Sequence, residues 1–303
     1  MVDIFRKLIK KIVPKRLIVF VKNLTTIERL DLVEKHLSTL LRLNYKQVSE
    51  NLGQRATFYN YEFKAYSKYG EDGILLYIFS KVGTTNHCFV EFGVEDGREC
   101  NTANLSLNFG WQGVLIDANK EWLEEARRFY QEKLGKDASR VKIIPCFVTA
   151  ENINKLLLDN GLQGEIDLLS IDIDGNDYWV WKAINAISPR VAIIEYNASF
   201  GLKPITIKYN PNFHYQKTYR QNPLYHGASL TALAKLGNSK GYILVGCDSQ
   251  GHDAFFVRKD AAEGKLAGLS AEVAFYPQPH RLKVIGSTEK QFEQIKHLDF
   301  DYV

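Results

Sequence analysis

The sequence has few cysteines and no pair of them at a metal-binding spacing. Its 303 residues contain four, at Cys88, Cys100, Cys146 and Cys247. The absence of a C-x-x-C pair argues against a zinc site, and four cysteines are too few for a fold held together by disulfides. Because unpaired cysteines suit a reducing compartment, the sequence predicts a cytoplasmic protein.

Long apolar runs and a strong charge of one sign are also lacking. The apolar run over residues 17–21 is far too short to span a bilayer, and no small-residue cleavage site follows it. The net charge is only +4, with acids and bases interspersed through most of the chain, so no nucleic-acid partner is predicted. With 45% hydrophobic residues the chain can bury a full core, which predicts one α/β domain with additions.

A glycine loop after a short apolar strand is the most informative stretch. Residues 89–97 read Phe-Val-Glu-Phe-Gly-Val-Glu-Asp-Gly. Gly93 and Gly97 lack a Cβ, so the loop can turn tightly and let a ligand approach its backbone. The loop departs from the G-x-G-x-x-G pattern of dinucleotide-binding proteins, and Glu95 and Asp96 within it would repel a pyrophosphate. Because these acids tolerate a cationic sulfonium or amino group, the loop points to S-adenosylmethionine.

Acids at strand ends supply the other cofactor contacts. The ends of parallel strands converge at one edge of an open sheet, whatever their separation in sequence. Asp117 closes the strand over residues 113–117, where a carboxylate can accept both hydroxyl hydrogens of a ribose. We therefore expect Glu91 and Asp117 to bind the methionine and ribose ends of the cofactor. Phe147, just past the third strand, is placed to pack against adenine, with a core position as the alternative.

These two stretches resemble motif I and the following acid of the class I methyltransferases. The segment over residues 167–177, Asp-Leu-Leu-Ser-Ile-Asp-Ile-Asp-Gly-Asn-Asp, is similar to the Ile-Asp-(Val/Ile)-(Glu/Asp)-Gly segment of the FkbM-type family. The resemblance, which spans residues 66–258, implies an S-adenosylmethionine cofactor. It also implies that Glu71 or Asp72 reaches the amino acid end of that cofactor, with helix capping as the alternative. The predicted cofactor-binding residues are Glu71, Glu91, Gly93, Gly97, Asp117, Ala118 and Phe147.

Apolar strands alternate with helical segments after the glycine loop, which is typical of a parallel sheet. We expect a Rossmann-like doubly wound sheet, mostly parallel with a C-terminal antiparallel hairpin, and an N-terminal helical arm. The expected strands cover residues 89–92, 113–117, 141–145, 166–172, 190–195, 242–247 and 253–257. The expected helices cover residues 67–82, 101–108, 119–134, 152–160, 177–187 and 229–236. The predicted parts are an arm over 1–60, a methyltransferase domain over 61–260 and a C-terminal extension over 261–303.

The arm contains two amphipathic segments. Residues 1–23 place apolar residues on one helical face and Lys or Arg residues opposite, with Pro14 interrupting the helix. This pattern favours either a helix lying on an anionic membrane surface, peripheral to the inner membrane face, or a helix docked on the domain or on a second copy of the chain. A stripe of four apolar residues follows, which predicts helix packing in the core or in a dimer seam. The stripe consists of Leu30, Val33, Leu37 and Leu40.

Further acids follow the fourth and fifth strands. Oxygen ligands from adjacent strand ends can hold Mg²⁺, so Asp172, Glu195 and Asn197 are the predicted metal ligands. Such a metal would lower the pKa of an acceptor hydroxyl. In the metal-free alternative, Asp174 and Asp177 cap the next helix and Glu195 pairs with a base. The metal-free alternative is favoured, because the FkbM-type motif does not generally mark a metal.

The predicted catalytic residues are Asp172, Asp174, His226 and His252. The two histidines are candidates for the general base because imidazole titrates near neutrality. The aromatic and polar segment over residues 201–225 suits a lid that binds the acceptor, since aromatic faces stack on sugars. A structural insertion is the alternative.

These features favour an enzyme that transfers a methyl group from S-adenosylmethionine to a hydroxyl of a saccharide or similar polar metabolite. Two other classes stay open. Asp172-Ile173-Asp174 is also the D-x-D pattern of metal-dependent glycosyltransferases, although that function would leave the glycine loop and Asp117 unexplained. A non-catalytic adaptor docked on a membrane could keep the fold without turnover.

Overall fold

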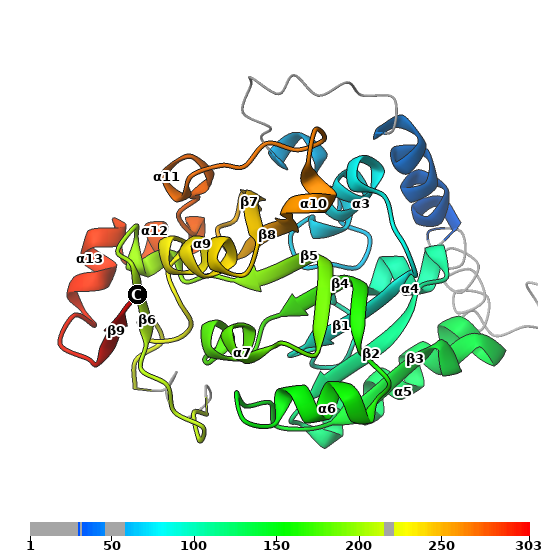
Figure 1. Cartoon of the computed structure of the whole chain (residues 1–303), viewed down its shortest axis with the longest axis horizontal. Coiled ribbons are helices and arrows are strands. Elements are labelled where there is room, and N and C mark those ends of the chain that lie inside the picture. Colours follow the sequence, from blue (N-terminus) through cyan, green and yellow to red (C-terminus); the bar gives the residue numbers. More distant parts are fainter. Residues whose placement is uncertain (1–29, 31, 46–57, 215–220) are drawn as a thin grey trace, which may run out of the picture.

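The structure, a computed structural model, describes residues 30, 32–45, 58–214 and 221–303 (Figure 1). Residues 1–23, predicted to form an amphipathic helix, lie outside the described residues. A seven-stranded sheet with the order β3-β2-β1-β4-β5-β8-β7 forms the centre. Its strands are β1 Cys88–Phe92, β2 Gln112–Asp117, β3 Val141–Pro145, β4 Gly164–Ile171, β5 Ile187–Glu195, β7 Tyr242–Cys247 and β8 Asp253–Arg258.

Strand direction in this sheet matches the sequence prediction. β1 pairs in parallel with β2 and β4, and β3 and β5 extend the parallel part on either side. β8 runs antiparallel to both β5 and β7, between which it lies. The mostly parallel sheet with a C-terminal antiparallel hairpin is therefore confirmed, and the carboxyl ends of β1 to β5 share one edge.

Helices cover both faces of the sheet, as a doubly wound fold requires. Alternate residues of β1 face opposite layers, because strand side chains have a period of two. Val90 and Phe92 pack in the core beneath α6, α7 and α9, whereas Phe89 packs in the core beneath α3, α4 and α5. These helices are α3 Glu71–Val82, α4 Ala103–Phe109, α5 Lys120–Leu134, α6 Ile153–Asp159, α7 Asp177–Ala183 and α9 Leu230–Ser239.

Helix boundaries differ most from the sequence prediction at the start of α3 and at the end of α7. α3 begins at Glu71 rather than near Ser67, whose hydroxyl accepts a hydrogen bond from the backbone N–H of Asp72. α7 ends at Ala183, four residues before the predicted end, because Ile184 is in an extended conformation with φ −60° and ψ 121°. The start of α9 follows the expected capping pattern, since the Ser229 hydroxyl accepts the backbone N–H of Ala232 at 3.0 Å.

The C-terminal extension folds together with the predicted lid. β6 (Ile205–Ile207) pairs antiparallel with β9 (Phe300–Tyr302) in a second, two-stranded sheet that the sequence did not predict. A small apolar core beneath this sheet joins residues of both segments, including Phe200, Ile205 and Phe292. The remaining helices are η1 Phe58–Tyr61, η2 Gly135–Arg140, η3 Ala198–Phe200, α10 Lys259–Ala262, α11 Ala271–Ala274, α12 Pro279–Val284 and α13 Thr288–Glu293.

The arm contributes one described helix over residues 32–45, here called the arm helix. It packs beside α3 and α4 through Ser38, Leu41 and Tyr45. The predicted stripe is not in the core: Leu30, Val33, Leu37 and Leu40 are 56, 59, 40 and 62% exposed. In the described part of the chain, no helix has the length and apolar character needed to cross a bilayer.

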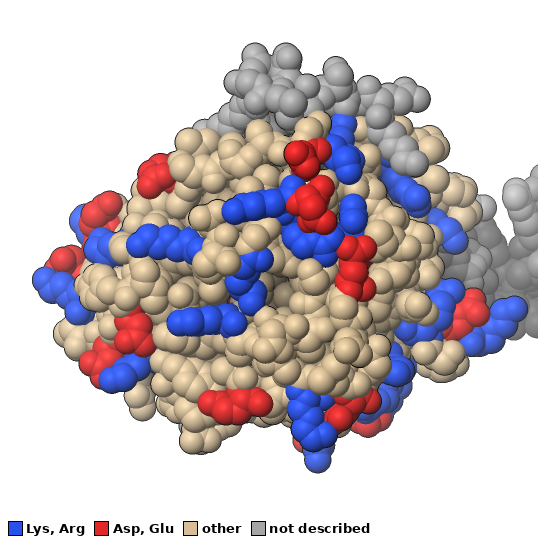
Figure 2. All heavy atoms as spheres, in the orientation of Figure 1, with Lys and Arg blue, Asp and Glu red and all other residues tan. Residues whose placement is uncertain are grey.

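The cysteines are unpaired and the surface charge is mixed (Figure 2). All four cysteines are free thiols. On the face shown in Figure 2, acidic and basic side chains are interspersed, without one large patch of a single sign.

Candidate functional site

The glycine loop after β1 lies directly against the end of β4. Gly93 has a φ of +77°, and a Cβ added to it would lie 1.5 Å from the backbone oxygen of Asp172. Only glycine fits this position, because both the conformation and the close approach exclude a side chain. Glu95 also has a positive φ, of 48°, and its backbone N–H donates to Asp117 Oδ2 at 3.0 Å. The loop and the acid at the end of β2 are therefore brought together, as predicted.

Glu91 is buried with its carboxylate fully engaged by the chain. Its oxygens accept hydrogen bonds from the backbone N–H groups of Asn101 and Thr102 and from the Thr102 and Ser170 hydroxyls. Burial is the main reason that its pKa is raised. In the structure Glu91 holds the segment before α4 against β1, whereas a direct contact with a cofactor stays a prediction.

The acids at the start of α3 serve the backbone around them. One oxygen of Glu71 accepts the N–H groups of Tyr69 and Gly70, both at 2.8 Å. One oxygen of Asp72 accepts the N–H groups of residues 65–67. These bonds hold the loop before α3 and do not cap the helix, whose N-cap Gly70 has no side-chain cap, and a contact of either acid with a cofactor stays a prediction.

Phe147 lies beyond β3 with 37% of its surface exposed, so it is not a core residue. Its ring faces His214 of the predicted lid, with 5.1 Å between the ring centroids. Ala118, which follows Asp117, is exposed at the same edge of the sheet. Both residues are accessible there, as cofactor contacts would need to be, and both assignments stay predictions.

Four acids gather at the carboxyl edge of β4 and β5, here called the acid cluster: Asp172, Asp174, Asp177 and Glu195. Burial is the largest cause of a raised pKa in each, and repulsion between neighbouring carboxylates adds to it in all except Asp177. The pKa of Asp174 rises to about 7 and that of Asp177 to about 6, while those of Asp172 and Glu195 are well above their usual range. Asp177 is also bonded to the loop before α7, accepting the N–H groups of Ile173 and Gly175 at 2.8 Å each.

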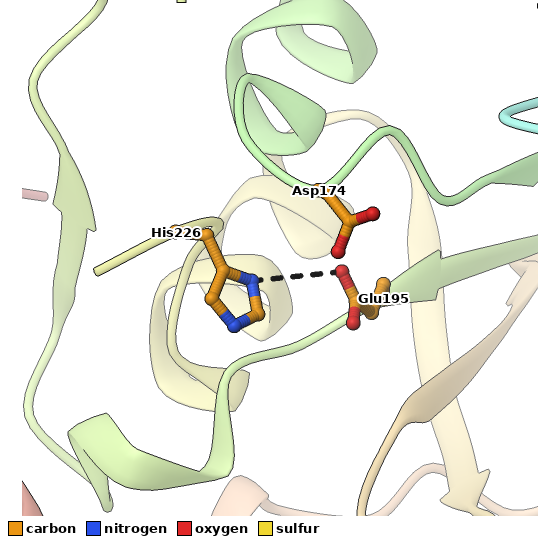
Figure 3. A group of neighbouring side chains, drawn as sticks. All are labelled: Asp174, Glu195 and His226. Atoms are coloured by element: carbon orange, nitrogen blue, oxygen red, sulfur yellow. Dashed lines mark ion pairs between the residues drawn. The ribbon is translucent and has the colours of Figure 1, made fainter. Parts of the chain in front are cut away.

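His226 belongs to this site and is buried beside the cluster. Figure 3 shows the carboxylates of Asp174 and Glu195 pointing toward one another, with the His226 ring facing the Glu195 oxygen that lies next to Asp174. The imidazole Nδ1 lies 3.8 Å from Glu195 Oε2. The other ring nitrogen, Nε2, lies 3.0 Å from the Arg281 guanidinium. Because a guanidinium only donates, Nε2 must accept, which leaves the imidazole proton on Nδ1, toward Glu195.

The prediction that His226 and His252 titrate near neutrality is wrong. Burial, followed by the charge of Arg281, lowers the pKa of His226 to about 3. Burial, followed by the charges of Lys68 and Arg281, lowers that of His252 to about 3 as well. The Gln278 amide occupies His252 Nε2 at 2.7 Å. Neither imidazole titrates near neutrality, whereas Asp174 does.

The predicted metal ligand Asn197 is not available. Its side-chain oxygen accepts the Ser199 N–H at 3.0 Å and a guanidinium N–H of Arg281 at 2.9 Å. Its amide nitrogen donates to the backbone oxygens of Leu224 and His226. The whole amide is therefore used to hold the chain after β5 in place, which contradicts the prediction that Asn197 holds a metal.

Among the residues that the structure describes, two groups without Asn197 bring ligand atoms close enough to one another to hold a cation. Asp174, Glu195 and His226 form the first, but a metal on Nδ1 would move the imidazole proton to Nε2, where it would oppose the donor of Arg281. Asp172, Asp177 and Glu195 form the second, an all-oxygen set that suits a hard cation such as Mg²⁺. The residues present therefore fit Mg²⁺ at the second group only.

Sequence reasoning missed two cations that face the acid cluster. Arg281 arises from α12 of the C-terminal extension, which carries no motif, so nothing in the sequence indicated its position. Lys68 lies just before α3, in a segment that the resemblance did mark. Burial acts to lower the pKa of Lys68, but the charges of Tyr69, Asp172 and Glu195 raise it overall.

Solved structures of methyltransferases are similar to this chain. One is the methyltransferase domain of bacterial CtHen1-C, at 16% identity over 61% of this chain and 95% of that chain, with a TM-score of 0.40. A second is magnesium protoporphyrin IX methyltransferase from Synechocystis PCC 6803 with bound SAM, at 11% identity over 62% and 77%, with a TM-score of 0.41. A third is a SAM-dependent methyltransferase from Thiobacillus denitrificans in complex with S-adenosyl-L-homocysteine, at 13% identity over 52% and 58%, with a TM-score of 0.33.

No protein-family model and no curated protein matches the chain. The fold assignment therefore depends on the sheet itself rather than on these distant likenesses. Parallel strands in the order β3-β2-β1-β4-β5, followed by an antiparallel β8 between β5 and β7, define a Rossmann-like methyltransferase fold. Membership of the FkbM-type family stays a prediction.

Proposed function

We propose that this chain is an S-adenosylmethionine-dependent methyltransferase of the FkbM type, acting on a hydroxyl of a saccharide or a similar polar metabolite. The observation that carries the proposal is the hydrogen bond between the glycine loop and Asp117, which joins the ends of β1 and β2. Ligands of open parallel sheets bind at this edge. Asp117 Oδ2 and Oδ1 each accept one backbone N–H, from Glu95 and Asn119, so each oxygen keeps a lone pair for a ribose hydroxyl.

The charge of this edge supports a cationic cofactor. Glu95, Asp117 and the acid cluster lie at the ends of β1, β2, β4 and β5, and the cations described there are Lys68 and Arg281. An excess of carboxylates repels a diphosphate but attracts a sulfonium and an ammonium group. The same excess argues against a nucleotide sugar unless a metal is present.

The acceptor would lie between the acid cluster and the lid. The ring of Phe213 packs on Gly175 so closely that a Cβ there would lie 2.5 Å from it, which places a lid aromatic beside the loop of Asp174. Tyr209, another lid residue, packs near Trp179 with 5.9 Å between ring centroids. Aromatic faces beside carboxylates suit the apolar faces and hydroxyl groups of a sugar.

S-adenosylmethionine supplies an electrophilic methyl group when it is bound. Asp174 would accept the acceptor's hydroxyl proton, because its pKa near 7 lets it hold or release a proton at neutral pH. The charges of Lys68 and Arg281 favour the ionised form of Asp174, which is the form that can accept this proton. If Mg²⁺ takes part, Asp172, Asp177 and Glu195 would hold it, and its positive charge would supply the polarisation of the hydroxyl instead.

Calorimetry with S-adenosylhomocysteine tests cofactor binding before an acceptor is known. Replacing Asp117→Ala removes a charged acceptor and should weaken binding by roughly 1.5 to 3 kcal/mol, whereas the exposed control Glu124→Gln should bind like the wild type. Unchanged affinity in Asp117→Ala, or binding of nucleotide sugars in place of S-adenosylhomocysteine, would overturn the proposal.

Turnover tests the acceptor side with labelled methyl transfer to a panel of saccharides. Asp174→Asn should lower turnover by roughly 10² to 10⁴ while leaving S-adenosylhomocysteine affinity unchanged. Loss of turnover on chelation, restored by Mg²⁺, would assign the activation to the metal set. Transfer to amines rather than hydroxyls would contradict the acceptor class.

A further inference from the structure

The arm helix packs on the domain through one face and presents a second, leucine-rich face to solvent. On the packed face, the Ser38 hydroxyl donates to Asn104 Oδ1 at 3.4 Å, and the Tyr45 ring meets Tyr61 and Tyr77 edge-on. The outward residues are Leu32, Val33, Leu37, Leu40 and Leu43, which are 52, 59, 40, 62 and 55% exposed. A contiguous apolar stripe of this kind on the surface of a protein marks an interaction site.

A cationic cavity lies next to the arm helix. Its volume is about 400 Å³, and it opens between the end of α3 and the starts of β1 and β2. Arg42 of the arm helix, Lys81 and Lys265 contribute cations to its lining, and no Asp or Glu is among the described residues that line it. Phe109 and Trp111 supply aromatic walls, with the Arg42 guanidinium 5.4 Å from the Phe109 ring centroid. A cavity with this lining suits a phosphate group carried on an apolar body.

We propose that the arm helix docks on an anionic lipid surface, with its leucines in the apolar layer and a lipid phosphate in the adjacent cavity. The charge distribution along the chain favours this occupant. Residues 1–29 contain eight Lys or Arg and two Asp or Glu, a net +6, so the other residues together carry −2 of the total +4. The positive charge of the chain is thus concentrated in the segment that directly precedes the arm helix in the sequence, and such a charge complements anionic headgroups.

A second copy of the chain would fit this surface less well. In a twofold dimer the same patch meets itself, so the leucines would be covered but two cationic cavities would be brought toward each other. The docked orientation also leaves the candidate site free. The cavity lies at the amino ends of β1 and β2, whereas Asp117 and the acid cluster lie at the carboxyl ends of the strands.

Vesicle co-sedimentation of the full chain tests the leucine face. The wild type should sediment with phosphatidylcholine vesicles that contain phosphatidylglycerol and not with phosphatidylcholine alone. The double variant Leu37→Glu with Leu40→Glu should weaken this binding by roughly tenfold or more per leucine. Each substitution removes the favourable free energy of moving a leucine side chain from water into the apolar layer of the membrane. The control Leu158→Glu, on a leucine that is 49% exposed in α6, should bind like the wild type.

The cavity is tested in the same assay. Lys265→Gln should weaken vesicle binding about fivefold, whereas the exposed control Lys136→Gln should not change it. Wild-type binding by the leucine variant would overturn the proposal, since residues 1–29 would then carry the contact alone. The proposal would also be overturned if the cavity bound inorganic phosphate while Lys265→Gln left vesicle binding unchanged. It would be overturned as well if light scattering showed that the leucine variant falls from dimer to monomer without losing vesicle binding.

Discussion

Asp174 offers a test of the acid cluster that needs neither cofactor nor acceptor. Its pKa of about 7 lies above the ordinary value of 3.8, mainly because it is buried and secondly because Asp177 is near. A carboxyl group whose pKa is raised on folding stabilises the protein below pH 3.8, and this contribution is lost as the pH rises through 7. Asp174→Asn should therefore be more stable than the wild type above pH 7 and equal to it near pH 4.

The size of this gain follows from the same pKa. The difference from 3.8 to about 7 is close to three pH units, and each is worth about 1.4 kcal/mol, which sets an upper bound of about 4 kcal/mol. Because Asp174 is partly exposed, water screens its charge, and we expect about 1 to 3 kcal/mol at pH 8. For a chain of this size this corresponds to a rise in Tm of roughly 2 °C per kcal/mol.

Thermal unfolding at half-unit steps of pH would measure this gain. The control Asp159→Asn, at an exposed acid paired with Lys155, should show no rise between pH 4 and 8. A Tm difference that is the same at pH 4 and pH 8, or a variant less stable than the wild type at pH 8, would refute the account of the acid cluster.

Two further predictions concern the glycine loop and the histidine. Gly93→Ala should lower the free energy of unfolding by about 2 kcal/mol or more, because its Cβ would meet the Asp172 backbone oxygen at 1.5 Å. The control is Gly161→Ala, because Gly161 also has a positive φ, of +79°, but has open space where a Cβ would lie. Denaturant unfolding of both variants therefore separates the cost of the steric clash, present only in Gly93→Ala, from the cost of backbone strain, present in both. Arg281→Gln should raise the pKa of His226 from about 3, since burial remains but the guanidinium charge is gone. Nitrogen-15 NMR of the imidazole would show this, and an unchanged pKa and tautomer would contradict the assignment to Arg281.

The sequence alone determined the sheet and the acids at its edge. Strands such as β1 and β2 are short apolar runs bounded by turn residues, and their period of two places Phe89 and Val90 on opposite faces without help from distant residues. The glycine loop and Asp117 were predicted for the same reason. A strand end fixes where the following residue lies, and parallel strands bring those ends together.

The tertiary structure decided the protonation and the partners of these residues. Both depend on burial and on charges from distant parts of the chain, which no local pattern encodes. Arg281, 55 residues beyond His226 in the sequence, fixes its tautomer and also uses the oxygen of Asn197. The arm helix shows the same limit. The spacing of Leu37 and Leu40 predicted an apolar face, but only the packing of Ser38 and Tyr45 against the domain determined that this face points to solvent.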